Sequence, residues 1–115
     1  MNLTDKKCVP CEGGVPAFGK DKIEQYLKEV PGWQATEIED NGKKVDSLQK
    51  RYQFANFREA MKFLREVEDI AEGEGHHPDF CVHYNKVDFT VWTHAIGGLS
   101  ENDFILAAKI DSIGK

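Results

Sequence analysis

The chain has 115 residues, of which 40% are hydrophobic and 30% are charged, a composition that fits one soluble domain with its own core. Its formal net charge of -5 argues against a sequence-independent grip on nucleic acid, which needs a basic face. No apolar run approaches the roughly 20 residues that span a bilayer, and the opening stretch lacks the apolar centre of a secretory signal. We therefore expect a cytoplasmic protein with no direct nucleic-acid partner and no membrane partner.

The first 19 residues form a lead that is rich in Gly, Pro and Lys and has no clear periodicity. This lead contains the CxxC pair Cys8 and Cys11, and the third cysteine of the chain, Cys81, is far away in the sequence. A lone CxxC is a weak zinc or redox signal, because a structural zinc site needs four ligands. We expect an extended lead over 1–19, mobile or docking, and one domain over 20–115.

The first half of the domain is predicted as a helix followed by a hairpin. Asn41-Gly42 favours a tight type I′ turn, so Trp33–Asp40 and Lys43–Phe54 are predicted to pair as strands. Before them, apolar residues recur at intervals of three and four and predict a helix that ends at Pro31-Gly32. The members of that stripe are Ile23, Tyr26, Leu27 and Val30.

The second half repeats this order. A longer amphipathic helix begins after Asn56, a plausible N-cap, and two alternating strands follow around a turn at Asn85-Lys86. A last helix opens at Ser100. The order helix, two strands, helix, two strands, helix predicts mainly antiparallel strand pairing, with the helices covering one face of a sheet. The longer helix has the stripe Phe57, Ala60, Met61, Leu64, Val67 and Ala71.

All four histidines lie between Glu72 and His94. A hairpin centred on Asn85-Lys86 would set His77 opposite His94, and so bring His94 beside the His76-His77 pair. Three interpretations of this cluster remain open: surface residues at a turn, a general acid–base site, or a three-histidine metal site with an open position. His83 is out of phase with its apolar neighbours and is expected on a solvated sheet face.

Two acidic residues near the cluster also have two interpretations each. Ser100-x-x-Asp103 resembles a capping box, and an acid in the first turn also suits the helix dipole. Glu72 near a helix C-terminus is usually a solvated carboxylate, although its unfavourable place on the dipole permits a functional role.

The spacing from Glu72 through His76-His77-Pro78, Tyr84 and His94 to Asp103 resembles that of the pterin-4a-carbinolamine dehydratase family. The resemblance covers roughly residues 20 to 113. It implies an α+β fold in which three helices cover one face of a four-stranded antiparallel sheet, in agreement with the order above. It also implies an enzyme that dehydrates 4a-hydroxytetrahydropterin to quinonoid dihydropterin in tetrahydrobiopterin recycling. It also implies histidine acid–base chemistry with no cofactor and no metal. Matching flanks are Pro31-Gly32-Trp33, Tyr84-Asn85-Lys86-Val87 and Gly98-Leu99-Ser100.

The resemblance also implies roles for single residues. His76, His77 and His94 are expected to be the catalytic set, Asp103 to orient or tune His94, and Glu72 to lie near the pterin. Further pterin contacts are expected from Gly75, Trp92, Thr93 and Ala95, with Phe80 as an aromatic wall or a core residue.

Members of the family form dimers and tetramers, so a homodimer or homotetramer is expected here. An exposed edge strand of a four-stranded sheet makes such pairing physically reasonable. The alternative function is a pterin-binding or partner-stabilising protein with little turnover, similar to the coactivator role of some animal members.

Overall fold

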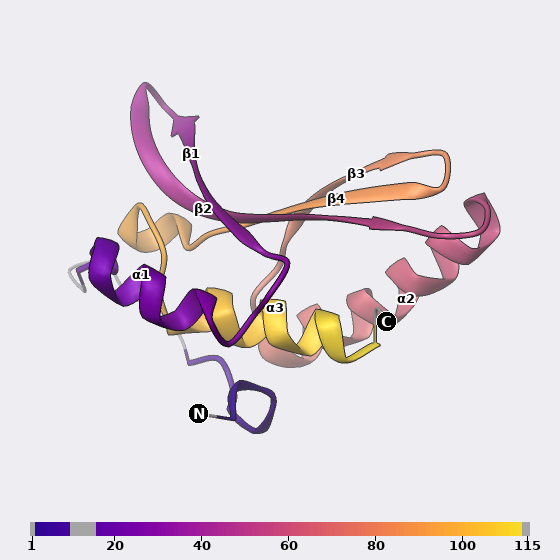
Figure 1. Ribbon diagram of the computed structural model, residues 1–115, viewed down its shortest axis with the longest axis horizontal. Coiled ribbons are helices and arrows are strands. Elements are labelled where there is room, and N and C mark those ends of the chain that lie inside the picture. The colour runs from indigo at the N-terminus through magenta and orange to yellow at the C-terminus, as the bar shows by residue number, and fades with distance from the viewer. Residues whose placement is uncertain (1, 10–15, 114–115) are drawn as a thin grey trace.

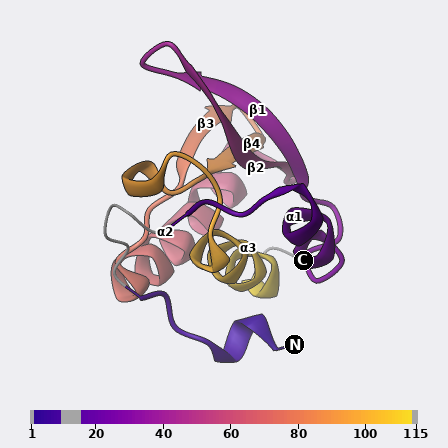
Figure 2. The same ribbon diagram turned by 90° about the vertical axis from the view of Figure 1, so that its left-hand side faces the viewer.

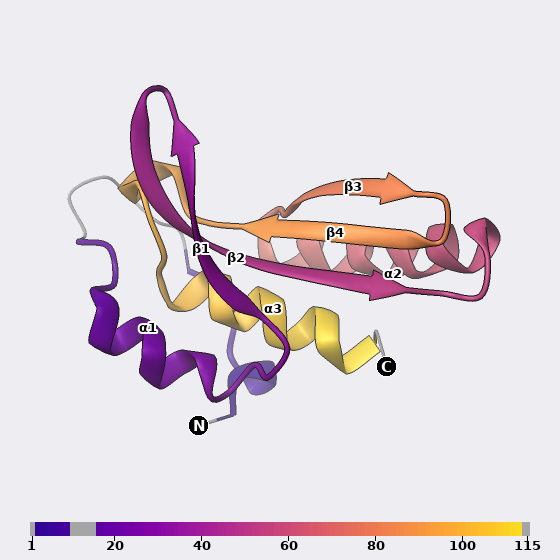
Figure 3. The same cartoon turned by 45° about the horizontal axis from the view of Figure 1, so that its top comes forward.

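The computed structural model describes residues 2–9 and 16–113. Within these residues, three α-helices and a four-stranded antiparallel sheet follow the order α-β-β-α-β-β-α, which confirms the predicted fold class. The helices lie under one face of the sheet (Figures 1 and 3). The elements are η1 (Leu3–Asp5), α1 (Lys20–Leu27), β1 (Gln34–Asp40), β2 (Lys43–Gln53), α2 (Phe57–Glu74), β3 (Asp79–His83), β4 (Lys86–Val91), η2 (His94–Ile96) and α3 (Glu101–Ile113).

The sheet consists of two hairpins joined side by side, with the strand order β1-β2-β4-β3. In the first hairpin Asp40 pairs with Lys43 across Asn41-Gly42. Both turn residues have positive φ, 51° for Asn41 and 80° for Gly42, as a type I′ turn requires. The predicted turn is therefore confirmed. The β2–β4 pairing leaves β1 and β3 as the edge strands.

The second hairpin turns one residue earlier than predicted. Tyr84, at φ 57°, and Asn85 form its turn, and His83 pairs with Lys86. The Asn85 amide donates to the Phe54 carbonyl at 2.9 Å and holds this residue in the turn beside the end of β2. The predicted pairing of His77 with His94 is therefore wrong by two residues, since the observed register sets position 77 opposite Trp92.

The core lies between the sheet and the helices, and α3 is its central helix. Seven of its residues are buried, because η1 and α2 pack against it, the sheet lies above it (Figure 1), and Phe104 packs on Tyr26 of α1 with ring centroids 5.1 Å apart. On α2, the predicted N-cap is confirmed, since the Asn56 side chain accepts a hydrogen bond from the Glu59 N–H at 2.9 Å. The buried residues of α2 are Ala60, Phe63, Leu64, Val67 and Ala71, whereas Phe57 and Met61 of the predicted stripe are exposed.

The N-terminal lead packs against the domain. Leu3 in η1 is 4% exposed and belongs to the core cluster, and η1 itself lies beneath α3 in Figure 1. The chain returns at Phe18, whose N–H donates to the Leu99 carbonyl at 2.8 Å. Cys11, the second member of the CxxC pair, lies outside the described residues.

Candidate active site

A cleft of about 700 Å³ lies where the end of α2, the start of β3 and the segment after β4 meet. It collects most of the residues singled out in the sequence, although they come from two stretches separated by a full hairpin. Those that line it are Glu72, Gly75, His76, His77, Trp92, Thr93, His94 and Ala95.

Gly75 sets the direction in which the histidine pair leaves α2. It is the C-cap of the helix at φ 67°, a left-handed conformation that glycine adopts without steric cost. Its N–H and that of His76 both bond the Ala71 carbonyl, at 2.9 and 3.3 Å. The chain then extends through Pro78 into β3, so His76 and His77 fall on the cleft.

The opposite side of the cleft is a short excursion after β4. Thr93 and Gly98 form an isolated antiparallel bridge, and the η2 turn between them presents His94 and Ala95. The His94 ring lies on the Trp92 indole, with centroids 3.7 Å apart. This side of the cleft thus supplies ring surfaces, and the α2 side supplies carboxylates.

Asp103 is fully buried beneath the cleft and binds His76. Its Oδ1 lies 2.6 Å from His76 Nε2, and its Oδ2 accepts from the Thr93 hydroxyl at 2.8 Å and the Ser100 N–H at 2.9 Å. Because the Thr93 hydroxyl donates to Asp103, its oxygen accepts from the Ser100 hydroxyl at 3.0 Å. Oδ2 thus accepts from two donors, and a His76 ring that donates from Nε2 gives the carboxylate a third.

The expectation that Asp103 orients His94 is wrong. Both of its oxygens are used by His76, Thr93 and Ser100, whereas His94 lies exposed in η2 against Trp92. The capping interpretation is supported alongside the histidine contact, because the Ser100 N–H is one of the groups that the carboxylate accepts from at the start of α3.

Glu72 and His77 form a second carboxylate–imidazole pair, at the rim. Glu72 Oε2 lies 2.6 Å from His77 Nε2, with side chains 72% and 59% exposed. In both pairs the carboxylate engages Nε2. A neutral ring that donates from Nε2 leaves Nδ1 as an acceptor, so each histidine retains a nitrogen able to take a proton.

His83 lies apart from this cluster. It is 59% exposed at the far end of the hairpin, with Nε2 3.5 Å from an Asp88 oxygen. Phe80 does not line the cleft: it is 50% exposed, its ring centroid lies 6.1 Å from that of the buried Phe89, and it lines a neighbouring groove that shares Glu72 and His77 with the cleft.

The cleft also contains residues that the sequence did not place there. Cys8 and Val9 of the lead line it, as do Glu74 and Asn102, which hydrogen-bond to them. The CxxC spacing pointed to Cys8 only as a weak zinc or redox signal, and no pattern pointed to the other three, because the four residues meet only in the folded chain. Among the residues that the structure describes, no group of three or more histidine, cysteine or acidic side chains is placed to hold a metal ion. Over the same residues, no helix is long and apolar enough to cross a membrane.

Comparison with known proteins gives one consistent family. Residues 16–113 match the family described as pterin 4 alpha carbinolamine dehydratase. A relative from Rubrobacter xylanophilus is 40% identical over 96% of this chain and 97% of its own length, and one from Halorhodospira halophila is 44% identical over 99% of each. Both are provisionally named pterin-4-alpha-carbinolamine dehydratase.

A solved structure shares the fold. The crystal structure of a protein described as transcriptional coactivator/pterin dehydratase, from Brucella melitensis, superposes with a TM-score of 0.74 at 27% identity. The match covers 86% of this chain and 99% of that one.

Proposed function

The chain belongs to the pterin 4 alpha carbinolamine dehydratase family and is a dehydratase, and from this premise we propose that it removes water from 4a-hydroxytetrahydropterin by histidine acid–base catalysis. The product is quinonoid dihydropterin. The single observation that carries the mechanism is the buried Asp103–His76 contact at the floor of a cleft that two further histidines line.

The reaction needs two proton transfers and no change of oxidation state. The 4a-hydroxyl leaves as water when an acid protonates it, and a base removes a proton from a ring nitrogen. His76 suits the base, because Asp103 fixes its Nε2 and stabilises the imidazolium that forms when Nδ1 takes the proton. His77 and His94, exposed on the two sides of the cleft, are the candidates for the acid.

The remaining residues of the cleft suit the binding of a flat heterocycle. The exposed His94 ring, packed on the buried Trp92 indole, offers ring surface, and Gly75 and Ala95 add backbone that approaches without large side chains. The Thr93 hydroxyl donates a hydrogen bond to Asp103, and the Glu72 carboxylate pairs with His77. We assign the protein to the recycling of tetrahydrobiopterin-type cofactors in the cytoplasm.

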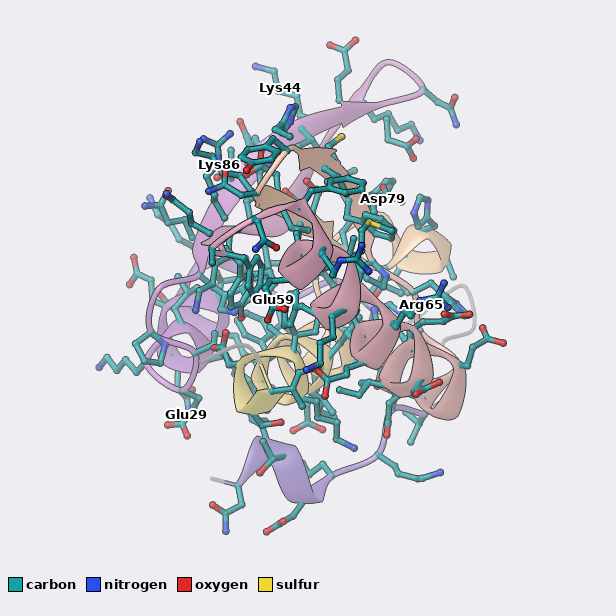
Figure 4. The ribbon with its side chains drawn as sticks, turned by 90° about the vertical axis from the view of Figure 1, so that its right-hand side faces the viewer. Glu29, Lys44, Glu59, Arg65, Asp79 and Lys86 are labelled. Atoms are coloured by element: carbon teal, nitrogen blue, oxygen red, sulfur yellow. The ribbon has the colours of Figure 1, made fainter. Side chains whose placement is uncertain are left out.

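We also propose that the chain forms a homo-oligomer through the side that β3 and α2 share, which is seen in Figure 4 with Arg65 and Asp79 labelled. A groove of about 430 Å³ runs there between the edge strand and the helix, and Phe80 and Met61 line it while exposed. The same groove is the observation that favours the second candidate function, stabilisation of another protein. The groove shares Glu72 and His77 with the cleft, whereas His76 and His94 line the cleft and not the groove, so the two functions would use neighbouring surfaces.

The test is the dehydration of freshly generated 4a-hydroxytetrahydropterin, followed by ultraviolet absorbance. We expect the wild type to accelerate it, His76→Ala, His77→Ala and His94→Ala to lose most of the acceleration, and the His83→Ala control to keep it. A folded wild type without any acceleration would overturn the proposal. Equal loss in the control would contradict the assignment of the site to these three histidines.

A further inference from the structure

The N-terminal arm, residues Lys6–Val9, reaches the cleft from the other end of the sequence. Cys8 and Val9 line the cleft together with His76 and His94. Figure 2 shows this segment, in indigo, running beneath α3 toward the end of α2. Resting on the proposed function, we infer that the arm is a wall of the pterin site, held in place by Asn102 and Glu74, and that it increases the affinity for the pterin.

Asn102 binds the arm by its main chain. The Val9 N–H donates to Asn102 Oδ1 at 3.0 Å, and Asn102 Nδ2 donates to the Val9 carbonyl at 2.6 Å. One amide thus pairs both main-chain groups of Val9, as a neighbouring strand would. Because Asn102 is only 5% exposed, releasing the arm would leave its buried amide with fewer partners, which is costly.

Glu74 provides the second attachment. Its Oε1 accepts from the Cys8 N–H at 2.8 Å, and its Oε2 pairs with Lys109 Nζ at 2.6 Å. The carboxylate side chain is 9% exposed. Burial acts to raise the pKa of Glu74, but the hydrogen bonds from Lys109 and the Cys8 N–H outweigh it and lower this pKa below its ordinary value. The arm is therefore held by an ionised acceptor.

The two residues that hold the arm each lie within two positions of an acidic residue that contacts a histidine. Glu72 contacts His77 and Glu74 contacts the arm, and in the first turn of α3 Asn102 contacts the arm while Asp103 contacts His76. The arm and the two imidazoles are thus positioned by the same two short segments. A change in how the arm sits is expected to act on pterin binding first and on proton transfer second.

Val9 gives the arm a chemistry that suits a ring. Its side chain is 66% exposed, and it is a branched apolar group on a cleft whose other walls carry many polar groups. Such a group can cover the face of a flat heterocycle and keep water from it, which favours ligand binding. Cys8 completes this wall, with its thiol 3.5 Å from the Asn102 carbonyl.

The first experiment measures kinetics and compares Val9→Ser and Asn102→Asp with the control Asn2→Asp. The control makes the same amide-to-acid change in the lead, at an exposed residue whose side chain makes no cap hydrogen bond. We expect KM for 4a-hydroxytetrahydropterin to rise about fivefold in Val9→Ser and about tenfold in Asn102→Asp, with kcat within about twofold of wild type, because an interaction shared by bound substrate and transition state changes KM alone. The Kd of 7,8-dihydropterin should rise by the same factors.

The second experiment measures alkylation of the Cys8 thiol and needs no turnover. Burial raises the pKa of Cys8 to about 12, so its alkylation by iodoacetamide should be slow while the arm is bound. In a Cys11→Ser, Cys81→Ser background, Asn102→Asp should speed the alkylation and 7,8-dihydropterin should slow it in the parent protein.

The kinetic measurement and the alkylation measurement together distinguish the role of the arm from the dehydratase mechanism. Normal turnover with unchanged KM in both variants and no protection of Cys8 would overturn the role of the arm and leave the dehydratase standing. Protection of Cys8 by 7,8-dihydropterin in a protein without turnover would support the arm as a wall of the site and overturn the dehydratase mechanism.

Discussion

Two carboxylate–imidazole pairs border the same cleft with the same Nε2–oxygen distance, 2.6 Å, in opposite surroundings. The carboxylate of Asp103 is 0% exposed and the His76 side chain 15%, whereas Glu72 and His77 are 72% and 59% exposed. A charge pair in water is worth little, because solvent screens it and flexible side chains must be ordered to make it. In a buried site the same contact fixes a ring and its tautomer. Distance alone therefore does not identify the pair that matters most for catalysis.

The largest effect is expected from Asp103→Asn, which leaves the shape of the buried pair and removes its charge. His76 would lose the acceptor that holds Nε2, and we expect kcat to fall about 10²- to 10³-fold. We also expect a loss of about 1–3 kcal/mol in the free energy of unfolding, because an amide cannot satisfy all three donors. Stopped-flow dehydration assays and urea denaturation measure the two quantities. An unchanged kcat would contradict the view that the Asp103–His76 pair contributes most to catalysis.

A smaller effect is expected from Thr93→Val, which keeps the volume of the side chain and removes one donor from Asp103. The carboxylate would retain the Ser100 N–H and His76, so kcat should fall only about tenfold, at a cost of about 1 kcal/mol in stability. Thr93→Ser restores a hydroxyl and should recover most of the rate. Failure of the serine variant to recover it would indicate that Thr93 acts by packing.

Glu72→Gln sharpens the comparison from the exposed side. We expect a two- to fivefold decrease in kcat/KM and no measurable change in Tm, because both members of this pair are largely in water. Glu68→Gln, one helical turn earlier on α2, is the matched control and should change neither quantity. A decrease as large as that of Asp103→Asn would contradict the view that burial distinguishes the two pairs.

Glu74 allows the effect of burying a carboxylate to be measured without a histidine partner, because it is buried and pairs with Lys109. Its pKa is lower in the folded protein, so the stability it contributes is fully present above the unfolded value of about 4.3 and is lost as pH falls through the folded value. The difference in unfolding free energy between wild type and Glu74→Gln should therefore be largest above about pH 4.3 and shrink below it. Denaturant titrations between pH 2.5 and 7 measure this difference, and a constant value would contradict the prediction.

Local sequence patterns sufficed for most of the fold. Asn41-Gly42 can adopt two adjacent positive φ values, so the first turn was predictable. The apolar stripe predicted the buried face of α2 correctly except at Phe57 and Met61, which are exposed. The second turn was predicted one residue late. Asn85 forms its contacts with Phe54, the residue that follows β2, and no local pattern contains such a contact.

The site was predictable in membership and less so in pairing. Spacing and family resemblance gathered the histidines, but they assigned Asp103 to His94. The partner of Asp103 depends on which side of the first turn of α3 faces the end of α2, which is a property of helix packing. The arm was missed for the same reason, since Val9 and Asn102 are 93 residues apart in sequence.

The most direct test of the central claim is a double-mutant cycle on dehydration rate, with His76→Gln, Asp103→Asn and the double variant. If Asp103 acts through His76, the double variant should be no slower than the slower single variant, because the second change removes a partner that no longer has a function. The parallel cycle with His94→Gln should be close to multiplicative in rate. Multiplicative losses in the His76 cycle, with coupling in the His94 cycle instead, would contradict the assignment of the buried pair as the centre of the site.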